Sequence, residues 1–149
     1  MWKQINEENL SLQPVKNYFH NKVIVITGAS AGLGRSFALM LAPFRCKIAG
    51  IGRNADALNL LKTEVEAEGS ECLALTCDVA QQHDCKNTIQ TVLDTWSSID
   101  ILINNAGFTD ISLFNPDTHI DIVRKVMDTN FFGSVYFTAY ALNSIQQQK

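Results

Sequence analysis

Short apolar runs alternate with longer segments of helical period along most of the chain. The runs cover residues 22–27, 46–51, 71–76 and 99–104, and each is mostly apolar. A parallel strand that is buried on both faces requires such a run, whereas an amphipathic helix repeats its apolar residues every three or four positions. The pattern therefore predicts four strands with helices between them.

The first predicted helix covers residues 33–41. Its apolar residues form one stripe, which we expect to face the core, and Pro43 marks its end because proline removes a backbone donor. The stripe consists of Leu33, Phe37, Met40 and Leu41.

Three further helices are predicted. In the second, Asn54 suits the N-cap and Gly69 the left-handed C-cap. The third covers 80–96, and the fourth runs from about Thr118 to the C-terminus. Strict alternation of strands and helices favours right-handed crossovers, and hence an α/β fold with a parallel sheet and helices on both faces.

We expect one domain over residues 22–149, preceded by an N-terminal extension at 1–21. The extension holds too many apolar residues for a free tail, so we expect part of it to pack on the domain or on a second subunit. In parallel sheets, ligands bind at the carboxyl ends of the strands. The candidate residues below lie at such ends or on the helix that follows the last strand.

Composition and charge narrow the class of protein. The chain has 46% hydrophobic residues, and its net charge of −3 gives no general attraction to nucleic acid or to an anionic membrane. No apolar run approaches the roughly 20 residues of a membrane span, and the start lacks the pattern of a signal peptide, so we expect a cytoplasmic location. The irregular spacing of the cysteines predicts buried, reduced thiols and no metal site. They are Cys46, Cys72, Cys77 and Cys85.

The stretch TGASAGLG follows the first predicted strand and opens the first helix. Gly28, Gly32 and Gly34 let the backbone approach a pyrophosphate closely, and a helix start offers unpaired N–H groups and a positive dipole end. A bare turn between strand and helix also uses glycine, but this context favours nucleotide binding.

The second strand ends in GIGRN. An Asp or Glu normally holds the free ribose 2′-hydroxyl of NAD(H) at this position, whereas a 2′-phosphate requires a cation. Arg53 occupies the position and no acid follows until Asp56, so we prefer NADP(H) to NAD(H). The alternative is a solvated surface arginine.

Two more strand ends carry characteristic residues, Asp78-Val79 after the third and NNAG at the fourth. With TGASAGLG, Arg53 and Asn130, which lies within VMDTNFFGSVYFT, they resemble the classical short-chain dehydrogenase/reductase family across residues 19–142. The members of this family are Rossmann-fold oxidoreductases. The resemblance therefore implies a Rossmann-type sheet, a dinucleotide cofactor and homo-oligomers.

The resemblance also implies a role for each matching residue. The glycine-rich loop would lie along the pyrophosphate, the residues after the third strand would hold adenine, and those after the fourth would pass under the ribose and nicotinamide. Ala31 stands where some NADP-dependent members carry a basic residue, so the expected NADP preference depends on Arg53. The implied cofactor-binding residues are Gly28, Ser30, Ala31, Gly32, Leu33, Gly34, Arg53, Asp78, Val79, Asn105, Ala106 and Gly107.

Asn130 matches the asparagine of the family's Asn-Ser-Tyr-Lys tetrad. Asparagine is a poor residue for the middle of a helix, and one held there is often tied to a π-type distortion or a water; the alternative is a structural asparagine. In the family the serine and the Tyr-x-x-x-Lys pair follow a fifth strand, and this chain ends before that point. Tyr136 and Tyr140 are four apart but supply no cation, so we expect them to pack ordinarily.

Two hypotheses follow. The first is the NADP(H)-binding portion of a short-chain dehydrogenase/reductase, whose complete form transfers hydride between nicotinamide and a small carbonyl or alcohol substrate. The second is a non-catalytic, truncated module that binds nucleotide or dimerises with a full-length relative, because a sheet that stops at the fourth strand leaves an apolar edge. A flavodoxin-like or nucleotide-signalling domain has no supporting acidic or phosphate-acceptor motif.

Overall fold

The computed structural model describes residues 18–111, 113 and 115–148, without the side chains of 116–119. Most of the N-terminal extension, residues 1–17, lies outside this part, and so does most of the packing expected of it. Its end does pack on the domain, since the ring of Phe19 stacks on Phe44 with centroids 5.8 Å apart.

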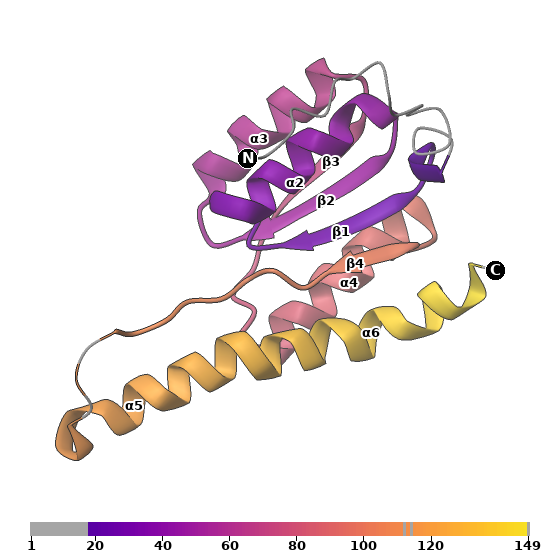
Figure 1. The fold of residues 1–149 in the computed structure, drawn as a ribbon. Helices are drawn as coiled ribbons and strands as arrows, with labels where there is room; N and C mark the ends of the chain where they lie inside the picture. Colours follow the sequence, from indigo (N-terminus) through magenta and orange to yellow (C-terminus); the bar gives the residue numbers. More distant parts are fainter. Residues whose placement is uncertain (1–17, 112, 114, 149) are drawn as a thin grey trace, which may run out of the picture.

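Four parallel strands form the sheet in the order β3-β2-β1-β4 (Figure 1). All five residues of the central strand β1 are buried, as a strand covered on both faces requires. The predicted parallel α/β sheet is confirmed. The strands are β1 (Val23–Thr27), β2 (Lys47–Gly52), β3 (Glu71–Thr76) and β4 (Ile101–Ile103).

Strand β4 is shorter than the predicted run at 99–104. After Ile103 the backbone N–H groups of Asn105 and Ala106 donate to the side-chain hydroxyl of Thr27 rather than to a strand carbonyl. At the carboxyl end of β4, a side-chain hydroxyl thus takes the place of the backbone hydrogen bonds between the strands. Among the described strands β4 is an edge of the sheet, and its three residues are half-buried.

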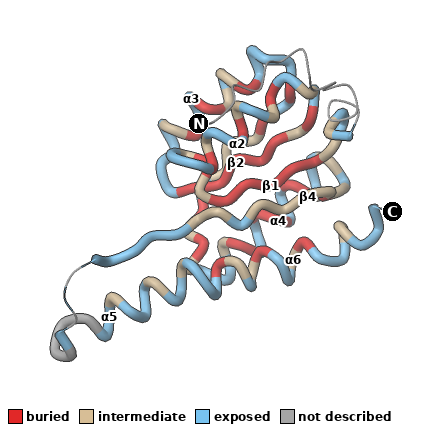
Figure 2. Tube along the Cα trace, viewed as in Figure 1, coloured by how far each residue is buried: buried red, intermediate tan, exposed pale blue. Residues whose placement is uncertain are grey.

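Helices cover both faces of the sheet (Figure 1). Helices α2 (Gly32–Leu41) and α3 (Ala55–Ala67) lie on one face, and α4 (Gln82–Trp96) and α6 (Gly133–Gln147) lie on the other. Each face has its own hydrophobic cluster against the sheet, drawn in red in Figure 2.

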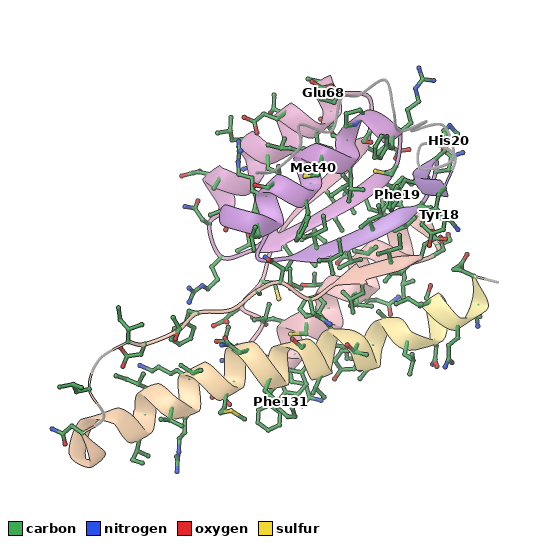
Figure 3. All side chains as sticks on the ribbon, in the orientation of Figure 1. Tyr18, Phe19, His20, Met40, Glu68 and Phe131 are labelled. Atoms are coloured by element: carbon green, nitrogen blue, oxygen red, sulfur yellow. The ribbon has the colours of Figure 1, made fainter. Side chains whose placement is uncertain are left out.

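The last helical segment is one long rod rather than a single α-helix. Helix α5 (Pro116–Met127) passes through a π-helical turn, η3 (Asp128–Phe132), into α6. Figure 1 shows α5 extending beyond the sheet, and Figure 2 shows it mostly exposed. Phe131 in the turn points away from the sheet (Figure 3).

The apolar stripe predicted for the first helix does not face the core, and this prediction was wrong. Helix α2 buries Gly34 and Ala38 instead, and Ala42 continues the buried side into the 3-10 turn η2 (Ala42–Phe44). Small residues at intervals of four let the helix lie close to the sheet, where larger side chains would not fit. Leu33, Phe37 and Met40 are exposed, and Leu41 is half-buried.

Candidate functional site: a pocket at the strand ends

The strand order places a switch point between β1 and β4, whose following segments go to opposite faces of the sheet. Such a point opens a crevice at the carboxyl ends of the strands. A pocket of about 400 Å³ lies there, lined by the segments that follow all four strands. Eleven of the twelve predicted cofactor-binding residues line it, namely Gly28, Ser30, Ala31, Gly32, Leu33, Arg53, Asp78, Val79, Asn105, Ala106 and Gly107.

The twelfth residue, Gly34, lies behind the pocket. A Cβ atom on Gly34 would lie 2.4 Å from the backbone oxygen of Gly28 and 2.5 Å from Nδ2 of Asn105. Gly28 and Gly32 have φ angles of +68° and +56°, which residues with a Cβ adopt only with strain. Glycine is therefore required for different reasons at the three positions. At Gly28 and Gly32 the backbone has a positive φ, and at Gly34 close packing leaves no room for a Cβ atom.

Helix α2 begins at this loop without a side-chain cap. Its N-cap residue is Ala31, and the first turn contains no acidic residue. The N–H groups of a first turn have no acceptor within the helix, so an anion can accept from them and gain from the helix dipole. A pyrophosphate fits this end of the pocket in charge and in hydrogen bonding.

Thr27, at the end of β1, joins the two central strand ends. Its Oγ1 accepts from the N–H of Asn105 at 2.9 Å and of Ala106 at 3.0 Å. Asn105 in turn donates from Nδ2 to the backbone oxygen of Thr27 at 3.0 Å. Thr27 was not among the predicted site residues, although its place between a buried strand and the glycine loop was a usable signal.

Asn130 does not line the pocket itself but clamps a residue that does. Its Oδ1 accepts from the N–H of Phe108 at 3.0 Å, and its Nδ2 donates to the carbonyl oxygen of Phe108 at 2.9 Å. Gly107 allows this approach, because a Cβ there would lie 3.2 Å from Asn130 Oδ1. The π-type distortion expected around Asn130 is confirmed by η3.

Arg53 and Asp78 stand at the outer strand ends of the pocket. Arg53 is exposed, and within the described part of the chain it makes no hydrogen bond or ion pair. Asp78 uses Oδ1 to accept from the N–H of Ala80 at 3.1 Å, which fixes the turn after β3. Arg53 therefore remains available for a ligand anion.

Four lining residues were missed as site residues, although each is a neighbour of one that was predicted. Gly52 lies close to the glycine loop, since a Cβ there would be 3.1 Å from Ser30 Oγ. Motif matching alone gave no role to these neighbours. They are Gly52, Cys77, Phe108 and Thr129.

The tyrosines of α6 are not site residues. Tyr140 accepts a 2.8 Å hydrogen bond at its hydroxyl from Gln82 Nε2, and Tyr136 stacks on Phe132. Both pack against the cluster under α4, as predicted. The spacing Tyr-x-x-x-Lys does occur at 18–22, but there Lys22 Nζ bonds Asp100 Oδ1 at 2.6 Å, beside the start of β1. That is the opposite end of the strand from the pocket.

Two other kinds of site find no support in the described residues. They contain no group of three or more His, Cys, Asp or Glu side chains placed to hold a metal ion. None of the helices in this part of the chain combines the length and the apolar character needed to cross a membrane.

Comparisons with known proteins agree with this geometry. A family model described as short chain dehydrogenase matches residues 22–149. The 11-beta-hydroxysteroid dehydrogenase-like 2 of Arabidopsis thaliana is 33% identical over 129 residues, 86% of this chain and 42% of that protein. Dehydrogenase/reductase SDR family member 7B of Mus musculus is 34% identical over 138 residues, 90% of this chain and 42% of that protein.

A solved structure shows the same fold. The crystal structure of NAD+-bound xylitol dehydrogenase superposes with a TM-score of 0.78 at 29% identity, over 87% of this chain and 50% of that chain. The chain spans about two fifths of the length of the curated relatives described above.

Proposed function

This chain belongs to the short chain dehydrogenase family, and we propose that it is the NADP(H)-binding portion of an oxidoreductase acting on a carbonyl or alcohol substrate. The family uses NAD or NADP, and the structural neighbour holds NAD+. Relatives named as hydroxysteroid dehydrogenases support the substrate class. The pocket at the strand ends carries the proposal, because it combines an uncapped helix start with an unpaired cation.

Arg53 supports NADP(H) over NAD(H). It follows β2, where the 2′-oxygen of the adenosine ribose is recognised. Among the described residues that line the pocket, Asp78, which follows β3, is the only carboxylate. A guanidinium binds a phosphate through two parallel hydrogen bonds. NADPH bound here would supply a hydride; the start of α2 would hold its pyrophosphate, Asp78 and Val79 would hold its adenine, and Asn130 would fix the loop at Phe108.

A titration tests the cofactor choice. We expect the purified chain to bind NADPH more tightly than NADH, and Arg53→Ala to lose about 1.5–3 kcal/mol of NADPH affinity, roughly 10- to 100-fold, with little effect on NADH. Lys86→Ala, which removes an exposed cation of α4 outside the pocket, is the matched control. Equal affinity for both cofactors in the unmodified chain would refute the NADP preference.

A second candidate, a module that binds nucleotide without turnover, is favoured by the lining of the pocket. None of the described residues that line it is a tyrosine or a lysine, the pair that would move a proton to or from the substrate oxygen. We expect the purified chain to bind NADPH without reducing a carbonyl compound. Steady oxidation of NADPH that depends on an added aldehyde or ketone would exclude this candidate.

A further inference from the structure

Phe108 lies at the β4 end of the pocket. It lines the pocket with 39% of the residue exposed, and it is the only aromatic residue among the described residues of the lining. The residues before it, Asn105, Ala106 and Gly107, bring only small or polar side chains to the same wall. A large, partly exposed ring at this end of the pocket suits a contact with a flat, ring-shaped part of a ligand.

The strand order indicates which part of a dinucleotide would reach this ring. Arg53 and Asp78 follow β2 and β3, whereas Phe108 follows β4, on the other side of β1. Neighbouring strands lie about 4.8 Å apart, so the ends of β3 and β4 are separated by about 14 Å along this edge of the sheet. With the adenosine at the ends of β2 and β3 and the pyrophosphate at the start of α2, the nicotinamide would fall at the end of β4.

Asn130 holds the backbone of Phe108 at two points. Its Oδ1 accepts from the N–H of Phe108 at 3.0 Å, and its Nδ2 donates to the carbonyl oxygen at 2.9 Å. Together these hydrogen bonds fix the position and the orientation of the backbone at this residue. Because the rotamers open to a side chain depend on its backbone, the clamp also limits the directions in which the ring can point.

The clamp is itself anchored in the core. Asn130 lies in η3, directly before α6, and Phe137 and Ala141 of α6 are fully buried. The start of α6 also lies close to the third strand end, since a Cβ on Gly133 would be 2.9 Å from Val79 Cγ2. Asn130 therefore ties a residue at the rim of the pocket to the packed interior.

We propose that the ring of Phe108 packs against the nicotinamide of the bound cofactor, and that Asn130 is a positioning residue that acts through this ring. The inference rests on the proposed function. It gives Asn130 a part in cofactor binding that does not require the other residues of the tetrad. Loss of the ring should then weaken a ligand that carries nicotinamide and spare a ligand that lacks it.

Two ligands separate this contact from the rest of the pocket. They are NADPH and 2′-phospho-ADP-ribose, which is the same molecule without its nicotinamide ring. We expect Phe108→Ala to weaken NADPH binding about tenfold, as the loss of one stacking contact does, and 2′-phospho-ADP-ribose binding less than about twofold. Calorimetric titration measures both affinities, and retained binding of 2′-phospho-ADP-ribose shows that the variant is folded.

Two further variants serve as controls. Phe108→Tyr keeps the ring and should retain the NADPH affinity. Phe131→Ala is the matched control, because Phe131 is an exposed phenylalanine of η3 that does not line the pocket and points away from the sheet (Figure 3). It should bind both ligands as the unmodified chain does.

Asn130→Ala tests the clamp. We expect this substitution to weaken NADPH binding about fivefold and 2′-phospho-ADP-ribose binding less than about twofold, because the ring loses its orientation while the rest of the pocket remains. In the Phe108→Ala background the same substitution should change NADPH binding by less than about twofold, since the ring that the clamp orients is already gone.

Equal effects of Phe108→Ala on the two ligands overturn the inference and leave the proposed function standing. So does an effect of Asn130→Ala on NADPH binding that is the same with and without the ring. An unmodified chain that binds neither ligand refutes the proposed function and the inference with it.

Discussion

At the scale of single residues, the hydroxyl of Thr27 links two strand ends, a role that sequence motifs do not reveal. Its oxygen accepts from two successive N–H groups after β4, and its own O–H lies 3.4 Å from the carbonyl oxygen of Ile103. With 2% of the residue exposed, water cannot easily replace it. This oxygen therefore links the end of β1 to the segment after β4, in addition to the ladder between the two strands.

Thr27→Val tests this role, because valine keeps the shape of threonine and removes the acceptor. Leaving Asn105 and Ala106 N–H groups without a partner should cost about 2–3 kcal/mol in the free energy of unfolding and weaken NADPH binding. Urea unfolding and a cofactor titration measure both. Thr27→Ser keeps the hydroxyl and should retain most of the stability and of the NADPH affinity. Equal losses in the two variants would contradict the role of the hydroxyl as an acceptor.

The glycines of the cradle make a second prediction at this scale. Gly34→Ala places a Cβ 2.4 Å from backbone, so it should cost about 3 kcal/mol of stability and abolish cofactor binding. The Cβ of Gly32→Ala would meet no atom of the described residues within 4 Å, so this variant should lose only the about 1–2 kcal/mol that its positive φ costs. Thermal unfolding of both variants measures the stability that each loses. A larger loss in Gly32→Ala than in Gly34→Ala would contradict the prediction.

The sequence predicted the residues of the cradle better than the links between them. Arg53 and Asp78 follow buried strands, and parallel strands bring their carboxyl ends to one edge, so their proximity followed from the pattern. The clamp of Asn130 on Phe108 joins residues far apart in the chain. No local pattern encodes which backbone group a side-chain amide will reach, and only the π-type distortion was predictable.

At the scale of elements, helix α2 shows how an apolar stripe can mislead. The stripe predicted a buried side, but the helix approaches β1 through Gly34 and Ala38, and Arg35 pairs with Glu64 on α3. Hydrophobicity ranks the larger side chains higher, whereas close packing of a helix on a sheet selects small ones. The start of helix α3 was easier to predict, because an N-cap residue can be recognised in the sequence. Asn54 caps α3 as predicted, since its side chain accepts from the N–H of Ala57 at 3.0 Å.

Two substitutions on α2 distinguish these faces. Ala38→Leu would overpack the buried side and should cost about 1–3 kcal/mol in the free energy of unfolding. Met40→Gln changes a residue that is 69% exposed and should stay within about 0.5 kcal/mol of the unmodified chain. Urea denaturation gives both values, and a larger loss for Met40→Gln would show that the stripe is part of the core.

At the scale of the whole molecule, the sheet carries thiols that resist ionisation. Cys72 is buried on the α2–α3 side with its pKa raised to about 12. The folded chain therefore keeps this proton between pH 9 and 12, while the unfolded chain releases it. More protons on the folded state mean that stability is fully present below about pH 9 and falls as the pH rises, by up to about 1.4 kcal/mol per pH unit.

Unfolding free energies measured near pH 8 and near pH 10.5 check this prediction. The loss between the two should be smaller in Cys72→Ala by about 2 kcal/mol, because the variant has no thiol to ionise when it unfolds. Other groups also titrate in this range, so the comparison uses the difference between the two proteins. An identical loss in both would contradict the prediction.

The alternation of elements predicted the layered sheet of the whole molecule, and the order β3-β2-β1-β4 agrees with it. The continuous rod of α5 and α6 was predicted as one helical stretch, but its direction was not. Gly133 allows the start of α6 to lie close to Val79, since a Cβ there would lie 2.9 Å from Val79 Cγ2. Such a contact between distant segments depends on the packed fold and leaves no periodic signal.

The π-turn η3 also determines how far α5 is rotated about the helix axis relative to α6. A π-turn holds more residues than an α-turn, so each residue inserted or deleted within Asp128–Phe132 rotates one half against the other by about 100°. Contacts of Phe137 and Ala141 with the core hold α6 in place. The half that rotates is therefore α5, and five residues beside the pocket set the direction in which its whole surface faces.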